Sequence, residues 1–108
     1  MFDGSSIEHQ AYDGFQLAKK EDLCVVTVNH RLNCLGYLDL SSFGEKYRRS
    51  ANLGMLDIIQ ALKWVQRNIC QFGGDPDNVT IFGQSGGGAK VSTLMNMPAA
   101  EGLFHRAM

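Results

Sequence analysis

At 108 residues with 44% hydrophobic side chains, the chain has the size and composition of one small globular domain and not of a disordered tail. Ten Lys and Arg against eleven Asp and Glu give a formal net charge of −1, which excludes a broad positive field for nucleic acid or an anionic membrane. Small neutral molecules are therefore the more plausible partners. No apolar run approaches the roughly 20 residues of a membrane-spanning helix, so we expect a soluble protein.

The cysteines favour a reducing compartment. Cys24, Cys34 and Cys70 are odd in number and cannot all pair within one chain, and two of them lie in apolar runs where a free thiol behaves as a small hydrophobe. Residues 1–10 lack a basic patch followed by an apolar stretch, so no secretory signal is visible. A cytoplasmic location is therefore expected, although this argument holds only if Met1 is the native start.

The first elements along the chain predict a helix and a buried strand. Tyr12 to Lys20 has helical apolar spacing, with two lysines near its end, where the helix dipole favours cations. Leu23 to Val28 is a continuous β-branched run without alternation, typical of a central strand covered on both faces of a parallel sheet. Asn33 to Ser50 is polar and predicts an irregular connection.

A long amphipathic helix is predicted from Asn52, a plausible N-cap, to about Gln71. Polar residues occupy one face, and apolar residues recur at intervals of three and four on the other: Met55, Ile58, Leu62, Val65, Ile69 and Phe72. Gly73 and Gly74 supply a helix stop, and residues 75–78 supply a turn.

The remaining elements complete an α/β pattern. A short strand is expected at 79–82, then a glycine-rich turn at 83–88 and a helix from Ala89 to Met97, which Pro98 ends. The alternating order of strands and helices implies parallel strands joined by crossover helices, which is the α/β class. No low-complexity linker marks a domain boundary, so one domain is expected. Two or three parallel strands are few for a stable sheet, so we expect part of a larger one. The last residues, 104–108, stop where another strand could begin, which favours the same interpretation.

The turn Gly83-Gln84-Ser85-Gly86-Gly87 has the Gly-x-Ser-x-Gly pattern of a nucleophile elbow. A sharp strand-to-helix turn would project the Ser85 hydroxyl, with Gly83 and Gly87 supporting the elbow where a side chain would crowd it. The Gly86 N–H would help to form an oxyanion hole at the helix start. The pattern alone is weak, but its place directly between an apolar strand and a helix favours a catalytic serine over a flexible Gly/Ser turn.

A phosphate-binding loop is a competing interpretation, because it also joins a strand to a helix through glycines. Gly83 and Gly88 have the required separation. However, Ala89 stands where the loop needs lysine, and Lys90 is displaced by about 100° around the helix. A nucleotide-binding domain is therefore the less favoured alternative.

Longer stretches resemble the type-B carboxylesterase family, the bacterial serine esterases related to cholinesterases. They include residues 29–32 (Asn-His-Arg-Leu), residues 52–57 (Asn-Leu-Gly-Met-Leu-Asp), residues 61–65 with 68–69 in the long helix, and residues 72–76 with 79–83 before the serine. The resemblance implies an α/β-hydrolase fold and hydrolysis of small-molecule carboxylic esters through Ser85, without metal or organic cofactor.

The resemblance also implies that the chain is an internal fragment of a single α/β-hydrolase domain. In this family an oxyanion loop precedes a segment like residues 2–6, and the catalytic acid and histidine follow the serine well downstream, beyond Met108. None of the three histidines is therefore expected to be the base: His9 lies in a polar loop, His30 suits packing or hydrogen bonding, and His105 matches a structural segment. Asp57 suits a cap or dipole partner better than a catalytic acid.

Three residues depart from the commoner family pattern. Gln84 replaces a glutamate, Gly86 replaces an alanine, and Lys90 is unusual in an elbow helix, where it is expected to be a solvated residue. The family also includes adhesion proteins that keep the fold and lose the nucleophile. A non-catalytic interaction protein is therefore a further alternative, and the presence of Ser85 argues against it.

Overall fold

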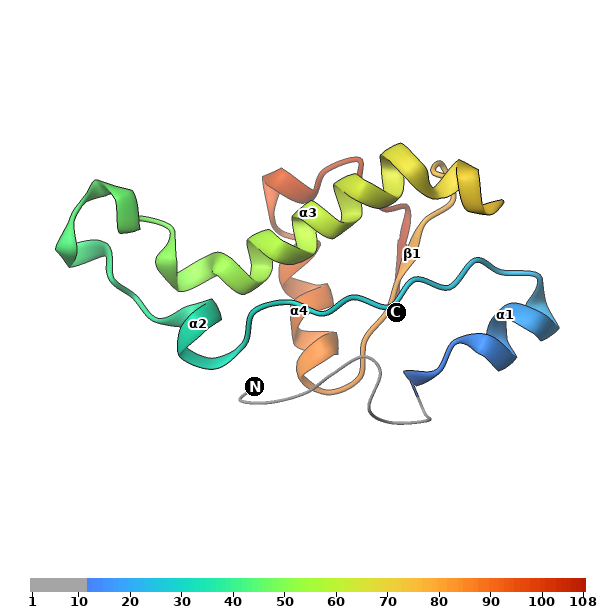
Figure 1. Cartoon of the computed structure of the whole chain (residues 1–108), viewed down its shortest axis with the longest axis horizontal. Coiled ribbons are helices and arrows are strands. Elements are labelled where there is room, and N and C mark those ends of the chain that lie inside the picture. The colour runs from blue at the N-terminus through green and yellow to red at the C-terminus, as the bar shows by residue number, and fades with distance from the viewer. Residues whose placement is uncertain (1–11) are drawn as a thin grey trace. The chain divides into compact units, whose positions relative to one another are not determined.

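The computed structural model describes residues 12–108, so the expectations placed on residues 2–6 and on His9 lie outside the described part. The chain divides into two compact units, one ending at Ile58 and one beginning at Ile59, which are described in turn. Figure 1 shows the course of the chain through its helices and its short strands.

The first unit is built from short helices. α1 spans Phe15–Glu21 and carries Lys19 and Lys20 in its last turn, which confirms the predicted first helix. α2, Asn33–Tyr37, lies in the segment expected to be irregular, and three single 3-10 turns follow it at Ser41–Phe43, Glu45–Tyr47 and Ser50–Asn52. The Ser50 hydroxyl accepts a hydrogen bond of 2.7 Å from the Leu40 N–H, which ties the two ends of this connection together.

The strand predicted at Leu23–Val28 is not formed, and this expectation is wrong for the chain as described. The segment runs without helix or ladder (Figure 1), and within residues 12–108 only two short strands pair with each other. Leu23 is 51% exposed and Val26 41% exposed. A strand needs a hydrogen-bonding neighbour, so an apolar β-branched run without one remains an uncoiled segment.

The long helix is confirmed as α3, Leu53–Asn68, continued by a 3-10 turn at Ile69–Phe72. Asn52, the predicted N-cap, is the last residue of the 3-10 turn that leads directly into this helix. The buried stripe also differs by one position, with Ile59 in place of Ile58; its members are Met55, Ile59, Leu62, Val65 and Ile69. Phe72 is 62% exposed, and its ring lies 5.8 Å from the ring of the half-exposed Trp64.

Gly73 ends this helical segment as expected. Its φ of 81° is the left-handed conformation that glycine adopts without a steric penalty, and its N–H bonds back to carbonyls of the last turn. The turn at residues 75–78 follows, closed by a 3.2 Å bond from the Asn78 N–H to the Asp75 carbonyl and by an Asp75 side-chain bond to the Asp77 N–H.

The second unit contains a parallel strand pair joined through a helix. β1 is Thr80–Ile81, α4 is Gly86–Leu94, a 3-10 turn occupies Pro98–Ala100, and β2 is Arg106–Ala107. Thr80 pairs with Arg106 and Ile81 with Ala107 in parallel register. This confirms the predicted α/β class. β2 lies within residues 104–108, where the chain was expected to stop before a further strand.

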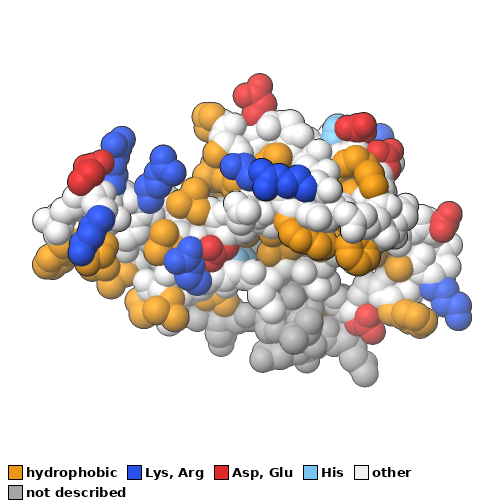
Figure 2. Space-filling view, turned by 45° about the horizontal axis from the view of Figure 1, so that its top comes forward, with side chains coloured by type: hydrophobic (Ala, Val, Ile, Leu, Met, Phe, Trp, Pro, Cys, Tyr) orange, Lys and Arg blue, Asp and Glu red, His pale blue; other side chains and the backbone are white. Residues whose placement is uncertain are grey.

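Much apolar surface remains exposed. Figure 2 shows hydrophobic side chains on the surface among the charged ones; exposed examples are Phe15, Leu35, Phe43, Trp64, Phe72 and Phe82. The three cysteines are unpaired, as expected from their odd number, and all three are exposed, including the two in apolar runs. In the described part of the chain, no helix has the length and apolarity required to cross a bilayer.

Candidate active site at the serine elbow

Ser85 stands at the turn between β1 and α4 with a backbone conformation that few residues adopt. Its φ is 54° and its ψ is −115°. A positive φ at a residue with a side chain is sterically costly and persists only where the surrounding structure imposes it. Such strain is typical of functional sites, and here it falls on the residue that the sequence pattern selected.

The Ser85 hydroxyl is not used to cap the helix that follows it. Serine at an N-cap usually accepts a hydrogen bond from the second or third N–H of the helix, but Ser85 makes no side-chain cap bond. The turn is closed by the backbone instead, through the Gly87 N–H to the Gln84 carbonyl at 2.8 Å and the Ala89 N–H to the Ser85 carbonyl at 3.1 Å. The strained φ therefore leaves an exposed serine whose hydroxyl has no capping role.

The glycines of the elbow have different roles. A Cβ on Gly83 would lie 2.4 Å from the carbonyl carbon of Gly87 and 2.6 Å from its oxygen, so only glycine fits at position 83. A Cβ on Gly87 would meet nothing within 4 Å. The expected crowding therefore holds for Gly83 and not for Gly87, because the close approach is between the Gly83 α-carbon and the Gly87 backbone.

Gly86 is the first residue of α4, so the helix starts three residues before the predicted Ala89. The earliest N–H groups of a helix have no carbonyl partner inside it, and they carry the positive end of the helix dipole. The Gly86 N–H lies directly after Ser85 at this end. This position suits the negatively charged oxygen of a tetrahedral intermediate, whose central carbon is bonded to the serine oxygen.

Lys90 is buried, which corrects the expectation of a solvated helix residue. It is 9% exposed, and its Nζ lies 3.5 Å from the Gly86 carbonyl oxygen, one turn earlier in the same helix. Burial lowers the pKa of the Lys90 ammonium from its ordinary value. Because Lys90 points to a carbonyl of its own helix, it does not present the lysine of a phosphate-binding loop.

The burial of Lys90 could have been found in the sequence. Lys90 precedes the buried Leu94 by four residues, and residues four apart share one face of a helix. The chemical type of the residue pointed to solvent, whereas its spacing pointed to the core.

His105 has a structural role in the second unit. The imidazole Nδ1 of His105 accepts a hydrogen bond of 3.1 Å from the Val79 N–H. The backbone N–H of His105 donates to the Val79 carbonyl at 2.8 Å. These bonds hold the start of β1, whereas Ser85 follows the end of that strand. This agrees with the expectation that His105 is structural.

Asp57 is an ion-pair partner in the first unit. Its carboxylate accepts hydrogen bonds from Arg31 Nε at 2.8 Å, the second guanidinium nitrogen at 2.6 Å and the Arg31 backbone N–H at 2.9 Å. The guanidinium holds the pKa of Asp57 at about 2. His30 Nδ1 donates to the Arg31 carbonyl at 2.9 Å, so Asp57 and His30 both bind the Arg31 segment.

The helix around Asp57 packs tightly on that segment. A Cβ on Gly54 would lie 2.5 Å from the Tyr37 hydroxyl oxygen and 2.6 Å from the Arg31 carbonyl oxygen. The Tyr37 hydroxyl is buried, and none of the described residues hydrogen-bonds to it. Position 54 in the sequence therefore needs glycine for packing.

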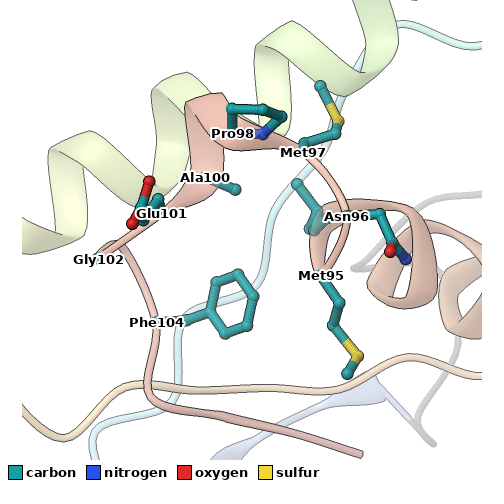
Figure 3. Close-up of a pocket in the computed structure, with 9 residues that line it drawn as sticks. Met95, Asn96, Met97, Pro98, Ala100, Glu101, Gly102 and Phe104 are labelled. Atoms are coloured by element: carbon teal, nitrogen blue, oxygen red, sulfur yellow. The ribbon is translucent and has the colours of Figure 1, made fainter.

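A separate pocket of about 310 Å³ lies at the other end of α4. Figure 3 shows Met95, Pro98 and Phe104 among the residues around it. Nine helical residues rise about 13 Å, so the helix separates this pocket from Ser85. Among residues 12–108, no group of three or more metal-ligating side chains comes together.

The parallel strand, the strained serine turn and the helix that follows make the elbow arrangement of an α/β-hydrolase, of which the chain holds a part. The chain belongs to the carboxylesterase family, whose model matches residues 1–108. The resemblance inferred from the sequence motifs is thereby confirmed.

Curated relatives and solved structures agree with this assignment. The chain is 57% identical over 97 residues to the para-nitrobenzyl esterase of Bacillus subtilis (strain 168), a match covering 90% of this chain and 19% of that protein. It is 50% identical to the human cocaine esterase over 90% of this chain and 17% of that protein. The chain thus spans about a fifth of the length of the curated relatives it matches.

Two solved structures superpose on almost the whole chain. An esterase from anaerobic Clostridium hathewayi that hydrolyses aliphatic aromatic polyesters has 67% sequence identity and a TM-score of 0.96, with 98% of this chain and 21% of that chain covered. A carboxylesterase of Geobacillus stearothermophilus has 53% identity and a TM-score of 0.94, with 98% and 22% covered.

Proposed function

We propose that the protein containing this segment hydrolyses carboxylic esters and that Ser85 is its nucleophile. The observation that carries the proposal is the strained, exposed Ser85 between β1 and α4. In this scheme the Ser85 oxygen attacks the ester carbonyl and the Gly86 N–H stabilises the oxyanion. A histidine outside this chain takes the serine proton and delivers it to the departing alcohol.

The resulting acyl-enzyme is then hydrolysed by water, which releases the carboxylic acid and returns the proton to Ser85. The chemistry needs no metal or organic cofactor. Membership of the carboxylesterase family supports small-molecule esters as the substrate class. A reducing compartment such as the cytoplasm is proposed from the three unpaired cysteines.

The test compares Ser85→Ala with a matched control, Ser92→Ala, in the complete protein, using short-chain p-nitrophenyl esters. Ser92 is an exposed serine of the same helix and has no place in the scheme. Ser85→Ala should lower kcat by at least about 10³-fold, because loss of the nucleophile removes the covalent route, and Ser92→Ala should retain full activity. Unchanged turnover in Ser85→Ala would refute the assignment.

A covalent label separates the esterase from the alternatives. A fluorophosphonate should add one phosphonyl group to the wild-type protein and none to Ser85→Ala, as measured by intact mass. A wild-type protein that neither turns over esters nor takes the label would be a non-catalytic interaction protein instead. ATP or GTP binding with magnesium would favour a nucleotide-binding domain.

The 108-residue chain by itself is proposed to be inactive, because it lacks the base and half of the oxyanion hole. Robust Ser85-dependent turnover by this purified segment would show that these partners have been misplaced.

A further inference from the structure

Lys90 is a buried cation on the helix that begins at the elbow. It is 9% exposed, and its Nζ lies 3.5 Å from the carbonyl oxygen of Gly86. Helical side chains lean toward the helix N-terminus, so the Lys90 stem runs back along the first turn of α4. Its charge is thus held next to the residue whose N–H follows Ser85.

The position of Lys90 carries two electrostatic costs. The N-terminal end of a helix is itself positive, and burial penalises the ammonium further. An apolar residue at position 90 would pack against the core without either cost. The first turn, Gly86 to Gly88, also has no side chains of its own, so Lys90 holds its leading carbonyl from one turn away.

We propose that Lys90 is a positioning residue for the oxyanion donor of the esterase, acting through Gly86. This inference rests on the proposed function of Ser85. The Lys90 ammonium fixes the Gly86 carbonyl and brings a positive charge close to the place where negative charge develops. Its effect is larger on the anionic tetrahedral transition state than on the neutral ester, because a positive charge interacts more strongly with the developing oxyanion than with a neutral carbonyl.

The test replaces Lys90 in the complete protein by Met, which keeps the unbranched stem without the charge, and by Arg, which keeps the charge. Lys90→Met should lower kcat by about tenfold, less than the loss of a direct oxyanion donor, with KM changed by less than about twofold. Lys90→Arg should recover most of kcat. Lys63→Met, on α3, is the matched control and should match the wild type.

A second readout separates positioning from packing. A trifluoromethyl ketone forms a tetrahedral oxyanion with the serine, whereas the product alcohol binds as a neutral ligand. Lys90→Met should weaken binding of the ketone by the same factor by which it lowers kcat, and it should leave binding of the alcohol unchanged. If the variant fails to fold, Lys90→Gln replaces it, because its neutral, shorter side chain removes the positive charge next to Gly86.

Several results would overturn this inference alone. They are wild-type kcat in a folded Lys90→Met or Lys90→Gln, equal weakening of ketone and alcohol, or failure of Lys90→Arg to recover activity. In each case inactive Ser85→Ala would leave the esterase proposal standing. If Ser85→Ala remains active, the proposed function itself fails.

Discussion

An alanine at position 83 would place its Cβ 2.4 Å from the carbonyl carbon of Gly87. An ordinary carbon–carbon contact needs at least about 3.4 Å, so the backbone at the elbow must move by roughly 1 Å. Neither atom belongs to a flexible side chain, and the movement must be taken up by the turn that carries Ser85. Overpacking of this kind costs about 1–3 kcal/mol of stability, and a displacement of about 1 Å can lower kcat about 10²-fold.

The matched control for Gly83→Ala is Gly87→Ala. Its Cβ has nothing within 4 Å, and alanine is preferred over glycine inside a helix by about 0.5–1 kcal/mol. Urea unfolding and p-nitrophenyl butyrate turnover of the complete protein should therefore separate the two variants, with Gly83→Ala impaired in both assays and Gly87→Ala at least as stable as the parent. Wild-type behaviour of Gly83→Ala, or equal damage by both substitutions, would refute the packing argument.

Three further outcomes are expected in the complete protein. His105→Ala should lower the unfolding midpoint, since its ring holds the Val79 N–H, while kcat stays within about threefold of the parent; a loss of about 10³-fold would instead make His105 a candidate base. Gly54→Ala should destabilise despite its better helix propensity, because its Cβ would lie 2.6 Å from the Arg31 carbonyl oxygen, and thermal melting measures this. Asp57→Asn should be less stable than the parent above about pH 4, and the difference should fade as the pH falls toward 2, because the depressed pKa of Asp57 makes its ion-pair contribution disappear over that range; a difference in urea midpoint that does not change with pH would contradict this.

The long helix was predictable because its pattern is local. Apolar residues spaced by three and four define one face, and Gly73 ends the segment through a conformation that other residues avoid. The one-position error between Ile58 and Ile59 arises because both are isoleucines at the edge of the same face. The sequence pattern locates a stripe about 100° wide, and packing decides which edge residue is covered.

The strand expected at Leu23–Val28 was not predictable in the same way. Its β-branched run indicates what the segment prefers when strands lie on both sides of it, yet pairing depends on residues far away in the chain. The short pair of β1 and β2 forms because both partners are present, with α4 between them. Local patterns therefore predicted helices well and strand pairing poorly.

At the elbow, sequence reasoning selected Ser85 and explained the need for Gly83, but it assigned the same steric role to Gly87. The difference depends on which α-carbon faces which backbone, and that is a property of the folded turn. The error at Lys90 has another cause. Lysine is rarely buried, so residue type outweighed a spacing that placed it on the face of Leu94.

The described parts of this elbow are made almost entirely of backbone: the φ of Ser85, the N–H of Gly86 and the space at Gly83. Replacing the family's more common alanine by Gly86 leaves the N–H donor in place, and replacing glutamate by Gln84 leaves the carbonyl that accepts from the Gly87 N–H. Backbone groups do not depend on side-chain identity, which agrees with the close superposition of this chain on solved esterases that are 67% and 53% identical to it. A side chain can then adjust the oxyanion environment only from outside these backbone groups, which is the role proposed for Lys90, whose Nζ lies 3.5 Å from the Gly86 carbonyl oxygen.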